Sequence, residues 1–150
     1  MQARSVVVAL VCVHILGCSW SESGPETPSG GSTDTIRTPL HAHLHGGSES
    51  LVAPDTVEAG QPFAVTFETS GNSCIEKGQP RVRSRHLRAV ITAYDVEVET
   101  PPMTVCQDYE RVFRHTVEVS LPEPGLSVLE VHGYGARMRP IVYSREIVVQ

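Results

Sequence analysis

Aromatic side chains are scarce in this chain, which has one Trp, four Tyr and three Phe among its 150 residues. Sites that stack sugars or nucleotide bases present several such rings on one surface, so the composition disfavours both. Positive charge is limited as well, because the net charge is −5 at pH 7. Nucleic-acid binding favours a clustered basic face. We therefore expect no nucleic-acid partner.

Recognisable catalytic motifs are also missing. The chain has no G-x-S-x-G elbow, no H-E-x-x-H helix, no phosphate-cradling glycine loop and no C-x-x-C redox pair. Acidic residues are plentiful, but no spacing marks two of them as a pair for acid–base catalysis. The sequence thus predicts a protein that is not an enzyme.

No apolar run is long enough to span a membrane as a helix, which takes about 20 residues. The longest run, residues 5–16, has about a dozen residues and follows the basic Arg4. A short apolar run behind a basic start is typical of a signal peptide.

Residues 15–18, with the sequence Ile-Leu-Gly-Cys, resemble the lipobox of bacterial lipoproteins. This resemblance implies that residues 1–17 are a signal peptide cleaved before Cys18, and that Cys18 carries acyl chains such as palmitate. The lipid would anchor the protein to a membrane of the cell envelope. Ser19 stands where some inner-membrane lipoproteins have aspartate, which favours the outer membrane in a Gram-negative cell. The alternative is an ordinary secretory peptide cleaved nearby.

The four cysteines divide according to this prediction. Cys12 leaves with the signal peptide and Cys18 takes the lipid, so Cys74 and Cys106 remain as one pair. Two free thiols are the alternative, which an oxidising compartment disfavours. We expect a disulfide between Cys74 and Cys106, which on the entropic model stabilises the fold by roughly 3–4 kcal/mol.

Residues 18–38 are rich in Ser, Gly, Pro and Thr and almost free of aliphatic side chains. Such a segment cannot bury enough apolar surface to offset its ordering entropy. We predict a flexible, disordered tether over residues 18–38 and a folded domain over 39–150, with its core in about 50–150.

After residue 39, apolar side chains recur at every second position, and turns rich in Pro and Gly separate the runs. The predicted strands cover residues 51–53, 63–69, 87–98, 113–121, 129–131 and 141–149. In 87–98 the apolar positions shift from odd to even numbers, which suggests a bulge or a bend between sheets. No segment shows a convincing helical period, so we predict an all-β sandwich or barrel.

Residues 57–67 and 121–131 resemble two parts of bacterial immunoglobulin-like domains: the opening strands, and the proline–glycine turn and strand near the end. The resemblance implies an immunoglobulin-like antiparallel β-sandwich for about the last hundred residues. A fold of this kind does not imply a function.

Three histidines alternate with two apolar residues in the segment His41-Ala42-His43-Leu44-His45. In an extended strand the three imidazoles lie on one face. Neighbouring imidazoles at this spacing can chelate Zn(II) or Cu(II), and a bend at Gly46-Gly47 could bring in the third. One hypothesis is therefore a metal site at His41, His43 and His45. The other is a half-buried strand with a polar outer face.

Other candidates are weaker. His115 falls in phase with an apolar face, which favours a hydrogen-bonded core histidine. The basic stretch from Lys77 to Arg88 is interpreted as a charged sheet edge, with attraction of an anionic lipid or glycan as the alternative.

These features predict a lipid-anchored, non-catalytic binding or scaffolding module of the cell envelope, without a cofactor. Its partner is an envelope protein or ligand that the sequence does not identify. The alternative function is periplasmic or surface binding of Zn(II) or Cu(II) through the histidine cluster.

Overall fold

The computed structural model describes residues 37–100 and 105–150. The predictions for residues 1–36, which comprise the signal peptide, the lipidation of Cys18 and most of the tether, lie outside the described residues. Strand β1 begins at Arg37, slightly ahead of the predicted domain boundary.

Strands account for nearly all regular structure in the described part of the chain. They are β1 (Arg37–His41), β2 (His43–Leu44), β3 (Thr56–Val57), β4 (Pro62–Gly71), β5 (Ile75–Lys77), β6 (Arg81–Arg85), β7 (Arg88–Thr92), β8 (Tyr94–Val98), β9 (Arg111–Ser120), β10 (Gly125–Tyr134) and β11 (Pro140–Val149). The helical elements of this part are two short 3₁₀ turns, η1 (Ser48–Ser50) and η2 (Ala136–Met138). The prediction of an all-β fold is confirmed.

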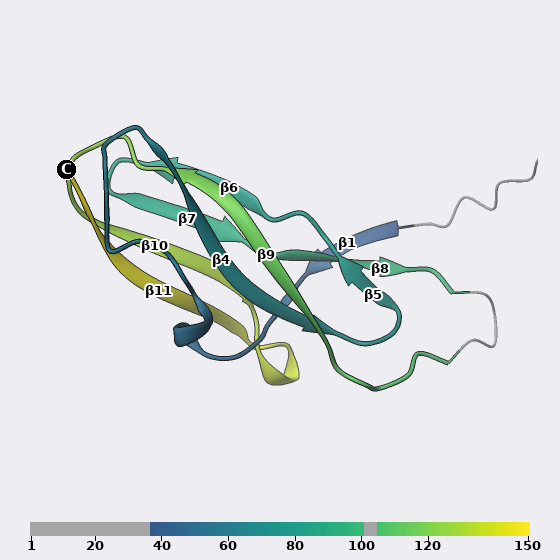
Figure 1. Ribbon diagram of the computed structural model, residues 1–150. Coiled ribbons are helices and arrows are strands. Elements are labelled where there is room, and N and C mark those ends of the chain that lie inside the picture. The colour runs from purple at the N-terminus through teal and green to yellow at the C-terminus, as the bar shows by residue number, and fades with distance from the viewer. Residues whose placement is uncertain (1–36, 101–104) are drawn as a thin grey trace, which may run out of the picture. The chain divides into compact units, whose positions relative to one another are not determined.

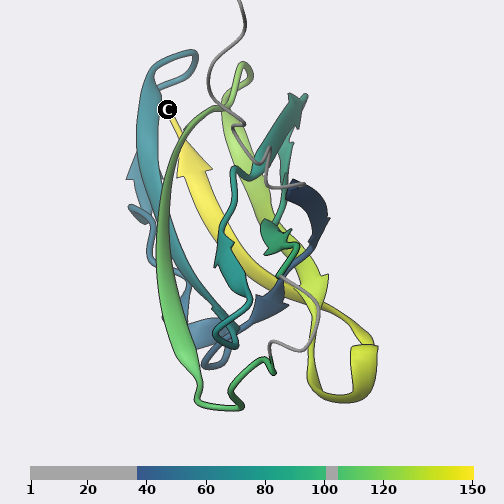
Figure 2. The same cartoon turned by 90° about the vertical axis from the view of Figure 1, so that its right-hand side faces the viewer.

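Two layers of strands face one another (Figure 1). β4 pairs with β9 along its whole length in one layer, and β10 pairs with β11 in the same way in the other. In Figure 2 the green β9 and the yellow β11 belong to these different layers.

The core lies between the two layers. Because successive side chains of a strand face opposite ways, every second residue of the long strands points inward. Val65 and Phe67 of β4, and Leu129 and Val131 of β10, are wholly buried there. Each such side chain stabilises the fold by about 1.5–3 kcal/mol. The molecule is therefore a β-sandwich, as predicted.

Parallel pairs occur beside the antiparallel ones. β10 is parallel to β7 and β2, and β11 is parallel to β3. From β7 the chain passes through β8, enters the opposite layer as β9 and returns as β10. A crossover of this kind brings two strands together in the same direction. The sheets are thus mixed, whereas the sequence predicted antiparallel ones.

Small residues mark the point where the chain passes between the sheets. β1 pairs with β8, but its continuation β2 pairs with β4. At the junction, Ala42 N–H donates to Ala93 O at 3.0 Å. A Cβ on Gly133 would lie 2.8 Å from Ala42 O, so only glycine fits at this position. The crossing places His41 in the sheet that contains β1 and β8, and His43 in the sheet that contains β2 and β4.

The run over residues 87–98 is interrupted at Ala93. β7 pairs with β10, whereas β8 pairs with β1 and β5, so the predicted bend between sheets is confirmed. The predicted shift of the inward positions is wrong, because Ala89, Ile91, Ala93 and Asp95 are all wholly buried. The even-numbered apolar residues of β8 are half-buried on its second face.

The predicted strand at 51–53 is wrong. Val52 alone makes a bridge, with Thr66, while Leu51 and Ala53 are buried in the core. A proline follows directly and has no N–H to donate, so no ladder forms. The short β3 comes next and pairs with β11.

β6 is an edge strand, with β7 as its partner among the described strands. All of its residues are exposed, and Arg81, Arg83 and Arg85 alternate along it. Charged side chains on an edge oppose pairing with other chains. The interpretation as a sheet edge is confirmed for Arg81, Arg83 and Arg85, whereas Arg88 lies in β7, between β6 and β10.

Candidate functional site

A pocket of about 440 Å³ opens where several strand ends meet three connecting segments, β4–β5, β8–β9 and β10–β11. It is lined by Leu40, His43, Ser70, Gly71, Asn72, Ile75, Asp95, Asp108, Tyr109, Glu110 and Met138. We call it the acidic pocket, because three of these residues are Asp or Glu and none is Lys or Arg.

The Cys74–Cys106 disulfide joins two of the three connecting segments that wall the acidic pocket. Its Cα atoms are 5.5 Å apart, and it links the β4–β5 loop to the β8–β9 segment. Beside it, Gln107 N–H donates to Ser73 Oγ at 2.7 Å, and Cys74 N–H donates to Asn72 Oδ1 at 2.9 Å. The predicted disulfide is confirmed, and it ties loops rather than strand centres.

Asp95 lies at the base of the acidic pocket and is wholly buried. Gly78 N–H donates to its Oδ1 at 3.3 Å, and its Oδ2 is buried without a hydrogen-bond partner in the described residues. A Cβ on Gly78 would lie 2.4 Å from Tyr94 O, so this close approach requires glycine. Leaving a buried acceptor unpaired is destabilising by about 1–3 kcal/mol. A further donor at Oδ2 would therefore be stabilising.

His115 completes a buried polar cluster beneath the pocket. Its Nε2 lies 2.8 Å from Thr69 Oγ1 and 3.4 Å from Asp95 Oδ1, and its ring stacks on Phe67 with centroids 5.1 Å apart. It is 1% exposed, which confirms the prediction of a hydrogen-bonded core histidine. The cluster is not a catalytic triad, because Thr69 and Asp95 both contact Nε2, whereas a triad uses both ring nitrogens.

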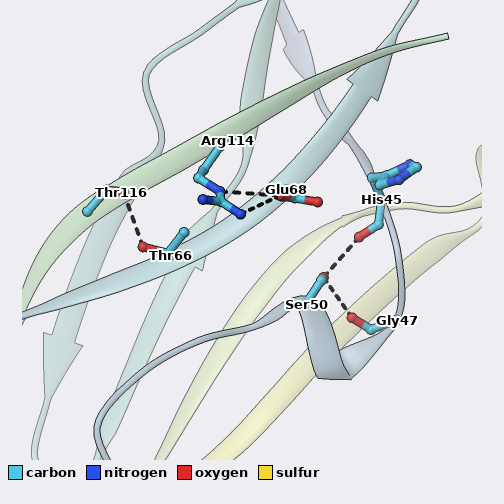
Figure 3. A network of polar contacts seen from close by, with 7 residues as sticks. All are labelled: His45, Gly47, Ser50, Thr66, Glu68, Arg114 and Thr116. Atoms are coloured by element: carbon cyan, nitrogen blue, oxygen red, sulfur yellow. Dashed lines mark hydrogen bonds and ion pairs between the residues drawn. The ribbon is translucent and has the colours of Figure 1, made fainter.

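Cross-strand pairs on the outer face of β4 and β9 set the register that brings His115 inward. Arg114 donates from Nε and Nη2 to Glu68 Oε1 at 3.3 and 3.2 Å, and Thr66 Oγ1 lies 3.1 Å from Thr116 Oγ1 (Figure 3). Pairs of this kind stabilise one strand alignment over others.

The three clustered histidines reach different surroundings. The two apolar residues between them are buried, as an extended strand requires. His41 packs against Tyr94 and Tyr134, with ring centroids 4.8 and 5.5 Å away, whereas His43 lines the acidic pocket. Within residues 37–100 and 105–150, no three His, Cys, Asp or Glu side chains are grouped so that they could hold a metal ion. The metal site remains a prediction that this arrangement does not favour.

His45 lies beside the acidic pocket, with its Nδ1 3.0 Å from Glu110 Oε1. The turn that follows it is held by Ser50, whose hydroxyl is shared between His45 O at 2.9 Å and Gly47 O at 2.8 Å (Figure 3). The 3₁₀ turn η1 thus supports the backbone of His45, and the imidazole in turn positions Glu110.

A wider depression of about 880 Å³ lies over β6, β7 and β10, with Arg83 and Arg85 among its lining residues. Inside it, Arg88 pairs with Glu130 at 2.7 Å. His132, which does not line the depression, has its Nε2 2.6 Å from the same carboxylate oxygen. The hydrogen bond from Arg88, and next that with His132, lower the pKa of Glu130 from its ordinary value. None of the described residues lining this depression has a buried polar atom without a partner. The acidic pocket is therefore the stronger candidate site.

Asp95, Asp108 and Glu110 were not identified as site residues from the sequence. Asp95 carried no clear signal, because the apolar residues on either side of it suggested that it faces outward, and only the structure shows it buried. Asp108 and Glu110 carried none, since only the disulfide and the fold bring their segment to the pocket.

Comparisons with protein-family models, with curated proteins and with solved structures found no match to this chain. In the part of the chain that the structure describes, no helix has the length and apolar character needed to cross a membrane. The function of the site is therefore argued from its geometry.

Proposed function

We propose that this protein is a lipid-anchored, non-catalytic binding module of the cell envelope, and that its binding site is the acidic pocket. Cys18 carries the lipid, and the anchor lies in the outer membrane when the cell is Gram-negative. The spacer, which ends before β1 begins at Arg37, holds the sandwich away from the bilayer.

Two features of the sequence support the anchor. The Ile-Leu-Gly-Cys segment at 15–18 follows a short apolar run, as in lipoprotein signal peptides. The Cys74–Cys106 disulfide uses the two other cysteines that follow the signal segment, so Cys18 is left without a disulfide partner in its own chain. Several acyl chains, at about 0.8 kcal/mol per buried CH₂, hold a protein firmly to a membrane.

The observation that carries the binding function is the unpaired Oδ2 of Asp95 at the base of the acidic pocket. Ligand sites are typically concave and largely apolar, with a few polar groups that fix orientation. The acidic pocket has this character, and the disulfide holds two of its connecting segments together. In the buried cluster next to Asp95, Thr69 and His115 are hydrogen-bonded but wholly buried, and no described residue orients His115 through Nδ1, which supports binding rather than catalysis.

Site-specific photocrosslinking in the living cell tests the proposal. Benzoylphenylalanine at Tyr109 or at Met138, both on the pocket, should form covalent adducts with a discrete ligand or partner that mass spectrometry identifies. The same probe at Glu118, exposed on β9 outside the pocket, is the matched control. Adducts that are absent at both pocket positions, or equal at all three, would contradict the proposal.

Metal binding through His41, His43 and His45 is the rival outcome. If the proposal holds, titration with Zn(II) or Cu(II) should reveal no site tighter than micromolar. Submicromolar binding that disappears when the three histidines are changed together to alanine would replace the proposal.

A further inference from the structure

We infer that the acidic pocket takes an organic ammonium group at the end of an alkyl chain, with Oδ2 of Asp95 as the atom that receives it. This inference rests on the proposed function and names the ligand chemistry of the same site. A free polyamine and the lysine side chain of a partner protein both present this chemistry.

One carboxylate oxygen of Asp95 accepts a hydrogen bond within the fold, and the other accepts none from the described residues. Oδ1 accepts from Gly78 N–H and lies near His115, whereas Oδ2 has no partner among the described residues. No Lys or Arg side chain lines the acidic pocket, and although Lys77 and Arg81 line a second cavity with Asp95, neither forms a hydrogen bond with Oδ2. A ligand that donates N–H and carries positive charge forms a charge-assisted hydrogen bond, which is stronger than a neutral one.

The walls of the pocket also favour a positively charged ligand. Asp108 and Glu110 add two carboxylates to that of Asp95. An anionic ligand would face three like charges, and such repulsion discriminates strongly between ligands. The pocket therefore favours a cationic ligand.

The remaining lining distinguishes an organic cation from a metal ion. Leu40, Ile75 and Met138 provide apolar surface for methylene groups, and about 440 Å³ accommodates a short alkyl chain. A bound metal ion usually takes four or more ligands, but no three metal-binding side chains are grouped within residues 37–100 and 105–150. An ammonium group has only three N–H donors to satisfy, so a few acceptors and an apolar channel suffice.

Calorimetric titration of the full lipidated protein in a neutral detergent tests the inference. The probes are cadaverine, a short peptide containing one lysine, and pentanol as the neutral analogue. Binding of an amine, weakening as salt is added, is the expected result, and pentanol should bind much more weakly. Stronger binding of cadaverine than of the peptide indicates a free polyamine, and the reverse order indicates a lysine side chain.

Two variants locate the site. Asp95→Asn keeps the shape of the side chain and should weaken amine binding roughly tenfold or more, the range expected on losing a hydrogen bond between charged groups. Asp108 is exposed, so Asp108→Asn leaves the core intact. It should weaken amine binding by a smaller factor. This second variant keeps the test informative if Asp95→Asn fails to fold. Glu118→Gln, an exposed acid outside the pocket, should bind as the parent does.

The inference is overturned if neither amine binds, if pentanol binds as well as cadaverine, or if Asp108→Asn and a folded Asp95→Asn bind like the parent. If photoadducts form specifically at the pocket but no amine binds, only the inferred ligand class is wrong. If there are no pocket-specific photoadducts and no amine binding, the proposed function is wrong as well.

Discussion

His115 is the residue on which the buried polar cluster depends. It stacks on Phe67 and approaches Thr69 and Asp95 through one ring nitrogen. His115→Ala should lower the free energy of unfolding by about 2–4 kcal/mol, because it opens a cavity and removes a partner from two buried polar groups. Urea unfolding measures the change. Thr116→Ala, at the neighbouring exposed position, is the control and should cost less than about 1 kcal/mol. A similar loss in both variants would contradict this account of His115.

Asp95 and His115 also show how far a residue can be understood from the sequence. His115 was placed in the core by its phase with the apolar residues of its strand. Asp95 occupies an equally inward position, but the apolar residues around it suggested the opposite phase. A side chain in a strand covered on both faces does not reveal its orientation by alternation alone.

Among the elements, two of the segments that wall the acidic pocket, the β4–β5 loop and the β8–β9 segment, depend on the disulfide. Changing Cys74 and Cys106 together to serine should lower the free energy of unfolding by about 3–4 kcal/mol, because the unfolded chain regains the freedom of a loop closed over a sequence separation of 32 residues. Amide hydrogen exchange should also accelerate in residues 72–75 and 107–110, because without the disulfide these residues leave their hydrogen-bonded arrangement. The paired strands β10 and β11 serve as the internal control and should keep their relative protection. Unchanged exchange in the walls would show that the disulfide does not hold the pocket.

The pairing of β7 with β10 carries a charge network whose effect depends on pH. The pKa of Glu130 is lowered from 4.5 by the hydrogen bond from Arg88 and then by that with His132. A group with a lowered folded-state pKa contributes stability above its unfolded pKa, and this contribution is lost as the pH falls through the folded-state pKa. Glu130→Gln should therefore cost about 0.5–1 kcal/mol at neutral pH, and the difference should shrink below the ordinary pKa of 4.5.

Urea unfolding of both proteins at a series of pH values measures this effect. Glu118→Gln, which changes an exposed acid on β9, serves as the control for removal of one negative charge. A difference between Glu130→Gln and the parent that stays constant down to strongly acidic pH would show that packing, rather than ionisation, explains the loss.

At the scale of the whole molecule, the proposed lipid anchor would decide where the sandwich works. Growth with an alkyne analogue of palmitate should label the parent protein, and mass spectrometry of the membrane fraction should find an acylated peptide that begins at Cys18. Cys18→Ser should abolish the label because it removes the acylated thiol. Cys12→Ser, inside the predicted signal peptide, should keep it. An unmodified Cys18, or a mature N-terminus further along the chain, would contradict the lipoprotein prediction.

The sequence by itself determined the properties that depend on local pattern. Alternation with a period of two is imposed by strand geometry, so the inward residues of β4, β9, β10 and β11 could be read directly. Turns rich in Pro and Gly marked the ends of most strands. Cysteine parity predicted the disulfide, because it needs only a count.

Only the tertiary structure decided which strands are neighbours and which side chains meet. Ala42, Ala93 and Gly133 allow the close crossing between sheets, but their small size has this meaning only when the crossing strands are known. The crossing separates His41 from His43, and the disulfide brings the segment of Asp108 and Glu110 to the pocket above Asp95. Contacts between residues far apart in the chain arise from the packing of whole layers, which no local period encodes.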